Sequence, residues 1–485
     1  MPETLHLTLD NLDSILSEQL DDDQVARAKT LFLKRLSEAA HRFYRGKLQT
    51  APKAGLFGFN WFNVWYTPGV SQISTTIRDD NVTSYDLSNR GNLVAIVTDS
   101  TRVLGDGNVS PPGGLGVMEG KAFLMKYLGG VDAVPLCIDS RDADGEHSAD
   151  KIIDFVQMVQ PSFGAVNLED IAQPNCYRVL DTLQTTCDIP VWHDDAQGTA
   201  CVTLAGLINA LKLAEKPIND VAMVLLGAGA SNTTIARILL QAGADPDRMM
   251  IFDSRGGLHT GREDIQSDSR FYRKWELCEQ TNPKRIDNFD AAMTGADVLI
   301  AASTPGPDVV KPESVSLMGS KPIVFACANP VPEIYPHTAK EAGAFIVATG
   351  RGDFANQVNN SLGFPAILKG ALLVRASGIS DGMTIAAAES LASFAEQRGI
   401  DPETIIARMD ERGVFPQEAA DVAMKAIDEG LARVTITRED AYAQAEADIE
   451  DAHKTVEVLM TEGLIAEPPQ EMLAEALEWA MEQVA

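Results

Sequence analysis

Two pairs of acidic residues, Glu169-Asp170 and Asp194-Asp195, are the strongest chemical signal in this chain. Each pair directly follows a short apolar stretch that is typical of a buried strand. Both pairs are therefore expected just past the carboxyl ends of strands, where open α/β sheets bind their ligands. Four carboxylates brought together at such an edge would repel one another and resist desolvation unless a cation compensated their charge.

A divalent metal ion is the cation that these residue types favour. Carboxylate oxygens without a Cys or His cluster suit Mg²⁺ or Mn²⁺ better than Zn²⁺. The alternative is that the acids cap helices, with Asp170 serving a helix that begins near Ala172 and Asp194-Asp195 serving one that begins near Thr199. Because a dinucleotide-binding pattern follows in the sequence, the two pairs together favour the metal site.

Three further side chains could take part in chemistry near this edge. Lys121 is expected at the start of a helix, where the helix dipole and a nearby metal would lower its pKa and make it a general base. Arg102 follows a predicted strand, where its guanidinium could hold a carboxylate through two hydrogen bonds. Tyr66 precedes a Pro-Gly turn and could deliver a proton in a closed site. Taken singly, Lys121 is more typical of a solvated surface lysine, and Tyr66 could equally be a buried tyrosine with a satisfied hydroxyl.

The elements that would position these groups are visible as sequence patterns. Residues 1–45 have mostly helical apolar spacing, and residues 92–99 predict a strand buried on both faces. A glycine-rich loop and the helix that carries Lys121 follow that strand. Residues 46–72 are rich in Gly, Pro and aromatic residues, and these aromatics are expected in a core or a subunit interface rather than in a base-stacking platform. After Gly198, a long helix is expected to link two domains.

A dinucleotide-binding pattern follows the second acidic pair. A predicted strand at residues 221–226 runs into the glycine turn GAGASN and then into a helix, the order in which a pyrophosphate lies on a helix N-terminus. Asn232 replaces the third glycine of this motif. The next predicted strand ends at Asp253, where an acidic residue can hold the adenine ribose hydroxyls. Asp253 favours NAD, whereas Arg255 could contact the 2′-phosphate of NADP, and both cofactors stay open.

Two asparagines lie in acceptor-rich turns beyond this pattern, Asn329 after a predicted strand and Asn360 in the sequence NNSLG. Their amides could hydrogen-bond a carboxylate or a carboxamide without adding charge, and the alternative is a turn-forming role. From Met383 onward the chain is expected to be helical and acidic, apart from a short extended piece at residues 434–437.

Length and composition limit the class of protein. A chain of 485 residues predicts two or three domains, and a net charge of −29 argues against nucleic acid or an anionic membrane as a partner. The six cysteines form no C-x-x-C pair, which is typical of reduced thiols in the cytosol. The N-terminus lacks a signal-peptide pattern, and no run of eighteen apolar residues occurs. These features predict a soluble cytoplasmic protein.

The order of several motifs resembles the malic enzyme family. The matching stretches are YTPGV, GNLVAIVTDSTRVLG, VMEGKA, NLEDI, HDDAQGTA, GAGA, ANP and NQVNN. They run in the family's order, and the resemblance extends from about residue 42 to about residue 450. Residues after about 453 have no counterpart in it.

The resemblance implies a role for each candidate residue. Tyr66 would be the general acid and Lys121 the general base, with Asp194 as its partner. The substrate's carboxylates would be bound by Arg102, Asn329 and Asn360, and the metal by Glu169, Asp170 and Asp195. The residues expected at the nucleotide are Thr199, Gly227, Gly229, Ala230, Ser231, Asp253, Arg255 and Asn329.

The resemblance also implies the fold and the reaction. The expected fold class is α/β, with an N-terminal α/β domain for malate and metal (residues 1–200), a Rossmann-type doubly wound parallel sheet (201–380) and a C-terminal helical extension (381–485). The expected reaction is the oxidative decarboxylation of malate to pyruvate with NAD or NADP and Mg²⁺ or Mn²⁺. The alternatives are a malolactic enzyme that releases lactate and a non-catalytic dinucleotide-binding sensor. A homo-oligomer, dimer or higher, is expected.

Overall fold

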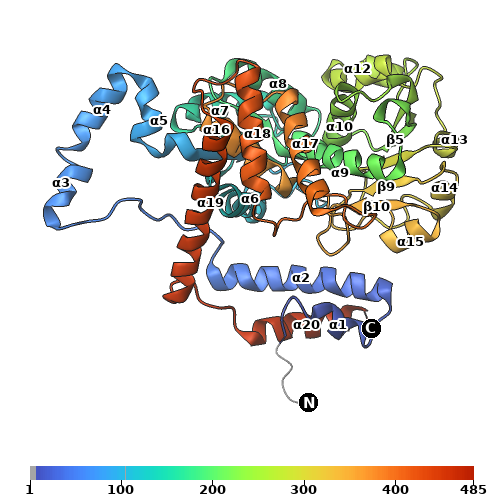
Figure 1. Ribbon diagram of the computed structural model, residues 1–485, viewed down its shortest axis with the longest axis horizontal. Helices are drawn as coiled ribbons and strands as arrows, with labels where there is room; N and C mark the ends of the chain where they lie inside the picture. Colours follow the sequence, from blue (N-terminus) through green and yellow to red (C-terminus); the bar gives the residue numbers. More distant parts are fainter. Residues whose placement is uncertain (1–6, 104, 485) are drawn as a thin grey trace. The chain divides into compact units, whose positions relative to one another are not determined.

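The computed structural model describes residues 7–103 and 105–484, and the chain divides into two compact units. The main unit comprises Pro52–Ala452, and the terminal unit is formed by the two chain ends, up to Ala51 and from His453 onward. Both β-sheets belong to the main unit, whose helices and strands can be followed in Figure 1. Within the described residues, no helix combines the length and the apolar character that crossing a membrane requires.

The terminal unit is helical. Its longest helix, α2 (Asp22–Tyr44), packs against α1 (Leu12–Ser17) and α20 (Gln470–Val484). The Asp21 carboxylate accepts a hydrogen bond from the Gln24 N–H at 2.9 Å, and the Gln24 side chain accepts one from the Asp21 N–H, a reciprocal cap that starts the helix. The unit has its own core, formed by Leu12, Leu16, Ala28, Phe32, Leu473, Ala476 and Ala480. The helical pattern expected near the N-terminus is thus confirmed from Leu12 onward, and residues 1–6 lie outside the described chain.

The first sheet of the main unit has four parallel strands in the order β2-β1-β3-β4. Its strands and covering helices are β1 (Leu93–Thr98), β2 (Asp132–Cys137), β3 (Ala165–Leu168), β4 (Val191–His193), α6 (Leu115–Gly129), α7 (Ala149–Val159) and α8 (Asn175–Thr186). Alternate residues of β1 point to opposite faces. Val94 and Ile96 share a core with α6, whereas Ala95 and Val97 share a core with α7 and α8. Both faces are covered, as the continuous apolar run in the sequence predicts.

The second sheet has six strands in the order β10-β9-β8-β5-β6-β7, all parallel except β7. The strands are β5 (Met223–Leu226), β6 (Met249–Asp253), β7 (Gly256–Gly257), β8 (Val298–Ala301), β9 (Ile323–Ala326) and β10 (Ile346–Thr349). The chain passes from β5 to β6 on one side and returns to β8 on the other. The crevice beyond the carboxyl ends of β5 and β8 is therefore a topological switch point, where such sheets bind nucleotides.

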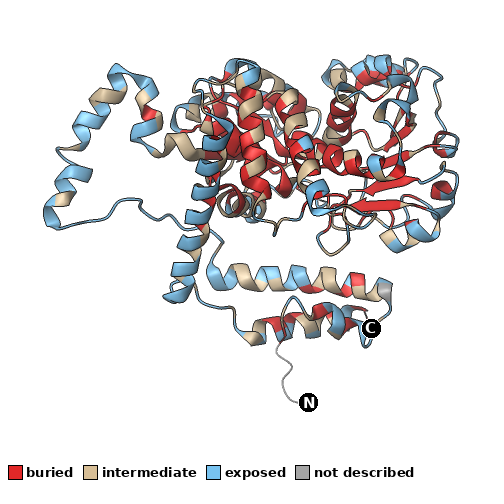
Figure 2. Ribbon diagram, viewed as in Figure 1, coloured by how far each residue is buried: buried red, intermediate tan, exposed pale blue. Residues whose placement is uncertain are grey.

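Helices connect and cover the two sheets. α9 (Thr199–Ala214) follows the first sheet, is buried along most of its length and packs against α10 (Ala230–Gln241) and α17 (Asp381–Arg398); its buried character is visible in Figure 2. Further helices are α3 (Phe62–Trp65), α4 (Val70–Asp79), α5 (Ser84–Leu87), α11 (Glu263–Gln266), α12 (Tyr272–Gln280), α13 (Phe289–Met293), α14 (Pro312–Ser316), α15 (Pro336–Glu341), α16 (Phe364–Leu373), α18 (Val414–Asp428) and α19 (Arg438–Thr461). The expected α/β class, with a Rossmann-type sheet and C-terminal helices, is confirmed.

One local expectation differs from the structure. α8 begins at Asn175 rather than near Ala172, because the residue before a proline is disfavoured in the helical region and Pro174 stands just before the helix. Residues 434–437, expected as a short extended piece, lie between α18 and α19 and belong to no helix.

A buried asparagine ties the central helix to its neighbours, and its loss should destabilise the fold. The Asn209 amide donates to the carbonyl of Ala392 at 2.9 Å and of Ile405 at 2.8 Å. We expect Asn209→Leu to lower the free energy of unfolding by about 1–3 kcal/mol, because two buried carbonyls lose their donor. The exposed Gln397→Ala serves as a control, expected within about 0.5 kcal/mol of wild type. Equal melting curves for the two variants would contradict this account.

Candidate active site

A buried lysine lies among carboxylates at the carboxyl edge of the first sheet. Lys121 comes from α6, Glu169 from the residue after β3, and Asp194 from a π-helical turn (Asp194–Gly198) after β4. The Lys121 ammonium lies 3.1 Å from Glu169 Oε1 and donates a hydrogen bond to Asp194 Oδ2. The side chains of Glu169 and Asp194 are 2% and 0% exposed, so these charges have left water almost completely.

Three carboxylates beside this lysine are grouped as metal ligands would be. One oxygen each of Glu169, Asp170 and Asp195 lies within 4.8 Å of the others. Asp195 Oδ2 also accepts a hydrogen bond from the Asp170 N–H at 2.7 Å, and the Asp195 side chain is 32% exposed, which opens the group to solvent. Asp170 has a left-handed backbone with a φ of 53°. This conformation costs energy for any residue other than glycine, and it turns the chain after Glu169 back toward the carboxylate group.

The helix-capping alternative is not supported. α8 starts at Asn175 without a side-chain cap, and the turn at Asp194 has no side-chain cap either. Successive residues of this turn point in different directions. Asp194 therefore faces Lys121, while Asp195 faces the Asp170 backbone.

Burial and mutual repulsion shift the pKa of these groups upward. Desolvation raises the pKa of Asp194 to about 7, and it raises the pKa of Glu169 as well, although Lys121 opposes both shifts. Burial by itself would lower the pKa of Lys121, but the carboxylates of Asp194 and Glu169 outweigh burial and raise it. The ammonium form of Lys121 is thus stabilised by its neighbours.

The expected position of Lys121 at a helix start is wrong. α6 begins at Leu115, so Lys121 lies in its second turn, beyond the reach of the dipole at the N-terminus. The charge of Lys121 is controlled by the carboxylates rather than by the helix.

The donor set fits a hard divalent cation. One lysine cannot compensate four carboxylates, so the site retains an excess of negative charge when all four ionise. Among the described residues, the metal-ligand group contains oxygen donors alone, which is the preference of Mg²⁺ and Mn²⁺. Glu169, Asp170 and Asp195 are the three residues expected from the sequence, and their role as ligands stays a prediction.

Neighbouring residues that were not predicted from the sequence hold the carboxylates in place. The Asn167 amide donates to Glu169 Oε2 at 2.9 Å, and the Trp192 indole N–H donates to Asp194 Oδ1 at 3.2 Å. The ring of Phe364 lies 4.6 Å from the Lys121 nitrogen. A polar Asn in the middle of a buried strand was the available signal for Asn167, because such a residue requires a partner.

A cavity of about 620 Å³ lies at the carboxyl ends of β5, β6 and β8. Five of the expected site residues line it: Arg102, Gly227, Gly229, Asp253 and Arg255. Thr199, Ala230, Ser231 and Asn329 do not line it. The Ser231 hydroxyl instead donates to the Asp195 carbonyl at 2.8 Å, which links the start of α10 to the carboxylate group.

The glycine turn fits a pyrophosphate. Gly227 has a φ of 100°, and a Cβ there would collide with the Ala302 carbonyl oxygen, whereas a Cβ on Gly229 would point into open space. Asn232 is fully buried, and its amide donates to the carbonyls of Leu226 at 2.8 Å and Gly227 at 3.0 Å. The asparagine that replaces the third glycine therefore ties α10 to the end of β5.

The expected ribose-binding residues are paired with neighbours. Both oxygens of Asp253 accept hydrogen bonds from Arg262, at 3.0 and 2.8 Å, and Arg255 pairs with Asp264 at 3.1 Å. Arg262 was missed because nothing in its spacing sets it apart. Three acidic and three basic side chains line the same cavity: Asp253, Asp264, Asp268, Arg102, Arg255 and Lys274. This balance of charge does not select NAD over NADP.

Two of the three expected substrate-binding residues, Arg102 and Asn360, contact the segments that carry the carboxylates. The Arg102 N–H donates to the Asp170 carbonyl at 3.0 Å, and its side chain reaches the nucleotide cavity. A Cβ placed on Gly198 would lie 3.2 Å from the Asn360 Cβ, so Asn360 packs against the turn that carries Asp194. Asn329 contacts the loop of Arg102, since a Cβ on Gly105 would lie 3.1 Å from the Asn329 carbonyl oxygen.

Tyr66 is not part of this arrangement within a single chain. It follows α3 on a segment whose side chains face solvent, and it is 73% exposed. The closed environment expected for this phenol is therefore wrong for one isolated chain.

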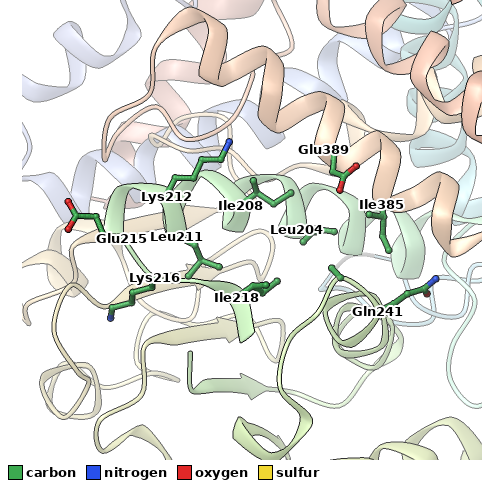
Figure 3. A pocket seen from close by; sticks show the side chains of 11 residues that line it. Leu204, Ile208, Leu211, Lys212, Glu215, Lys216, Ile218, Gln241, Ile385 and Glu389 are labelled. Atoms are coloured by element: carbon green, nitrogen blue, oxygen red, sulfur yellow. The ribbon is translucent and has the colours of Figure 1, made fainter. Parts of the chain in front are cut away.

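A second cavity of about 580 Å³ lies away from the carboxylates, between α9, α10 and α17. Figure 3 shows that Leu204, Ile208 and Leu211 of α9 line it, with Lys212 and Glu389 among its charged residues. It contains none of the expected site residues.

The fold and the site together are those of a dinucleotide-dependent oxidoreductase of the α/β class, with a group of carboxylates that suits a divalent metal. A family profile described as "Malic enzyme, N-terminal domain" matches residues 59–184, and one described as "Malic enzyme, NAD binding domain" matches residues 196–427. The chain belongs to the malic enzyme family.

Individual relatives agree with this assignment. The chain is 41% identical to the bifunctional malic/malolactic enzyme of Bacillus subtilis, over 82% of this chain and 94% of that protein. It is 39% identical to the NAD-dependent malic enzyme of Geobacillus stearothermophilus, over 81% of this chain and 78% of that protein. A crystal structure of the Entamoeba histolytica malic enzyme superimposes with a TM-score of 0.98, at 61% identity, over 99% of this chain and 100% of that chain.

The last comparison extends beyond the resemblance seen in the sequence. Residues after about 453, which had no counterpart there, have one in the Entamoeba histolytica structure. A TM-score of 0.98 over nearly the whole chain also requires residues 52–80 to follow the same course in both structures.

Removing one carboxylate should weaken metal binding without disturbing the fold. We expect Asp170→Asn to reduce the affinity for Mn²⁺ at least about tenfold, because a charged ligand is lost. Asn tolerates the left-handed backbone at this position, so the substitution adds no strain. Titration calorimetry with Mn²⁺ alone measures the effect. Asp188→Asn, an exposed carboxylate outside the group, is the matched control, and equal affinities for the two variants would remove Asp170 from the ligand set.

The glycine turn offers a separate test of the nucleotide cavity. Gly227→Ala should weaken NAD(P)H binding by at least about tenfold, because the left-handed backbone and the collision with Ala302 force the turn to shift. Gly229→Ala adds a Cβ that points into open space. This variant therefore tests the effect of an added methyl group in the cavity without backbone strain. Fluorescence titration of NADH and NADPH gives both affinities. Unchanged binding in Gly227→Ala would place the nucleotide elsewhere.

Proposed function

We propose that the chain catalyses the oxidative decarboxylation of (S)-malate to pyruvate and CO₂, with reduction of NAD or NADP and dependence on Mg²⁺ or Mn²⁺. The observation that carries this proposal is the hydrogen bond from Lys121 to Asp194 beside the carboxylate group of Glu169, Asp170 and Asp195, in a chain of the malic enzyme family. The nucleotide cavity adjoins this group through Arg102. Base, metal ligands and cofactor cavity thus belong to one site.

Glu169, Asp170 and Asp195 would hold the divalent cation, and the glycine turn at Gly227 and Gly229 would hold the dinucleotide. When bound, the nicotinamide would accept a hydride from C2 of malate, and the cation would draw electron density from the C2 oxygen as the C4 carboxylate leaves.

The proton transfers fall to side chains of the protein. Lys121 takes the proton of the C2 hydroxyl, which requires the neutral amine. Asp194 Oδ2 accepts the hydrogen bond of Lys121 and is therefore the neighbour placed to receive the lysine proton. Tyr66 is assigned as the acid that protonates C3 after CO₂ has left. Arg102, Asn329 and Asn360 orient the two carboxylates of malate.

The segments 1–200, 201–380 and 381–485 divide these tasks in the proposal. The first segment supplies the acid, the base and the metal ligands, and the second supplies the nucleotide cavity together with Asn329 and Asn360. The third contributes α17 and α18, which pack against α9 and α16.

Lys121→Ala should abolish turnover and leave nucleotide binding nearly unchanged. The expected loss in kcat is at least about 10²–10⁴-fold, because the general base is removed. The measurement follows malate-dependent reduction of NAD and of NADP with Mn²⁺, and a melting curve with Mn²⁺ checks folding. Lys212→Ala, which breaks an exposed ion pair with Glu396 on α9, is the matched control. Normal turnover in Lys121→Ala would remove its assigned role.

A second function is favoured by one observation, the bifunctional malic/malolactic relative from Bacillus subtilis. A malolactic enzyme would keep its nicotinamide bound and release lactate. Product analysis separates the two reactions, since accumulation of pyruvate with reduced cofactor supports the main proposal and lactate without net reduction contradicts it.

A further inference from the structure

Glu333 is a buried acidic residue at the carboxyl edge of the second sheet. It lies between β9 and α15, and it is 0% exposed. It does not cap the helix that follows, because α15 begins after Tyr335 without a side-chain cap. A carboxylate removed from water in this way requires hydrogen bonds from the groups around it. These bonds come from two turns that follow neighbouring strands.

The two side-chain oxygens of Glu333 accept hydrogen bonds from different turns. Oε1 accepts from the Ser303 N–H at 2.7 Å and from the Ser303 hydroxyl at 3.0 Å. Oε2 accepts from the Ala328 N–H at 3.0 Å. Ser303 follows β8 and Ala328 follows β9, and these two strands pair directly. We call residues 302–304 the nucleotide turn and residues 328–330 the substrate turn.

A carboxylate suits this bridge because it has an acceptor at each end. An amide has an acceptor at one end only, so a glutamine could serve one turn but not both. The backbone of Glu333 is held as well, since its carbonyl accepts from the Val310 N–H at 3.0 Å. Burial raises the pKa of Glu333, and the N–H groups of Ala328 and Ser303 act in the opposite direction. The carboxylate form is therefore stabilised by the two turns that it connects.

The nucleotide turn forms part of the wall of the nucleotide cavity. Ala302, Ser303 and Thr304 all line this cavity. The turn also packs against the glycine turn, since a Cβ on Gly227 would collide with the Ala302 carbonyl oxygen. A shift of the nucleotide turn would therefore change the cavity in which the dinucleotide is proposed to bind.

The substrate turn carries Asn329, which is assigned to a carboxylate of malate. Asn329 directly follows Ala328, whose N–H is held by Glu333. On the other side of Asn329, the Pro330 carbonyl accepts a hydrogen bond from Arg351 at 3.0 Å. The turn is thus fixed before and after the residue that is expected to bind the substrate.

The loop that carries Arg102 rests on both turns. A Cβ on Gly105 would lie 3.1 Å from the Asn329 carbonyl oxygen and 3.2 Å from the Pro305 side chain, which directly follows the nucleotide turn. The distance between the two turns therefore also determines where the Arg102 loop lies.

We propose that Glu333 is a positioning residue that fixes the nucleotide turn relative to the substrate turn, an inference that rests on the function proposed above. It acts through Ser303 and Asn329 rather than by contact with the reacting atoms. Hydride transfer from malate to the nicotinamide requires the two reacting carbons to meet in one geometry. A misplacement of about 1 Å in such a geometry can lower the rate on the order of 10²-fold.

Glu333→Gln tests this role without a change in side-chain size. The Gln oxygen is expected to stay with Ser303, which offers two donors, so that its NH₂ group faces the Ala328 N–H and releases the substrate turn. We expect kcat/KM for malate to fall at least about tenfold, with a higher KM, because Asn329 is no longer fixed. Steady-state kinetics with Mn²⁺ and saturating NAD or NADP measure the effect.

Two affinities measured on the same preparation separate positioning from a general loss of stability. The carboxylates assigned to the metal belong to the first sheet, and the nucleotide turn keeps its hydrogen bonds in Glu333→Gln. Mn²⁺ affinity by calorimetry and NADH affinity by fluorescence should therefore equal the wild-type values. If both affinities fall together with kcat/KM, Glu333 serves stability alone and the inference is overturned. A wild-type kcat/KM in Glu333→Gln overturns it as well.

Glu333→Asp tests whether reach or charge is required. Aspartate keeps the charge and both acceptors but is one methylene shorter, so it cannot reach Ser303 and Ala328 together. We expect the same loss of at least about tenfold in kcat/KM for malate. Recovery of the wild-type value in Glu333→Asp would show that charge alone is needed, which contradicts a bridge between the two turns.

Glu418→Gln is the matched control. Glu418 lies on α18 and is also 0% exposed, but within the described residues neither of its side-chain oxygens has a hydrogen-bond partner. The same substitution there connects no turns, so kcat/KM for malate should equal that of the wild type. A wild-type protein that does not reduce NAD or NADP with malate contradicts the proposed function itself. Turnover that is equal in wild type, Glu418→Gln and Glu333→Gln contradicts the role of Glu333 alone.

Discussion

The burial of Lys121 among carboxylates is the interaction on which the candidate site depends. Charges removed from water are costly unless they are paired, and the ammonium pairs with Asp194 and Glu169 at close range. The charge of one lysine does not neutralise the carboxylates of Glu169, Asp170 and Asp195. The negative charge that remains favours the binding of a divalent cation. Glu169 both stabilises the ammonium form of Lys121 and belongs to the group that would hold the cation, so base and metal site are linked by charge.

The fold supplies this arrangement through the ends of two neighbouring parallel strands. β3 and β4 pair directly, so the residues after their carboxyl ends lie side by side. Beyond β3 the backbone turns through the left-handed Asp170, and beyond β4 it turns through a π-helical segment that sends Asp194 and Asp195 in different directions. Strained or unusual backbone is thus concentrated where the carboxylates converge, and the buried strands on either side hold it in place.

Much of this could be predicted from the sequence, because the relevant patterns are local. Apolar runs marked the strands, and the acidic pairs at their ends identified Glu169, Asp170, Asp194 and Asp195 as a group. Contacts between residues distant in sequence were harder to predict. The pairing of Asp253 with Arg262, for instance, depends on how a loop returns to its strand. The position of Lys121 within α6 was misjudged because that helix begins at Leu115 without a side-chain cap, directly after the turn Pro111–Gly114. The exposure of Tyr66 could not be predicted either, since an aromatic sequence fits a core and an interface equally well.

The most direct test of the central claim is a crystal structure of the protein with Mn²⁺ and a reduced dinucleotide, recorded at a wavelength where manganese scatters anomalously. The account predicts one anomalous peak in contact with oxygens of Glu169, Asp170 and Asp195, with the Lys121 nitrogen and the nicotinamide ring on either side of a shared space. A peak elsewhere, with these three carboxylates making no contact to the ion, would contradict it.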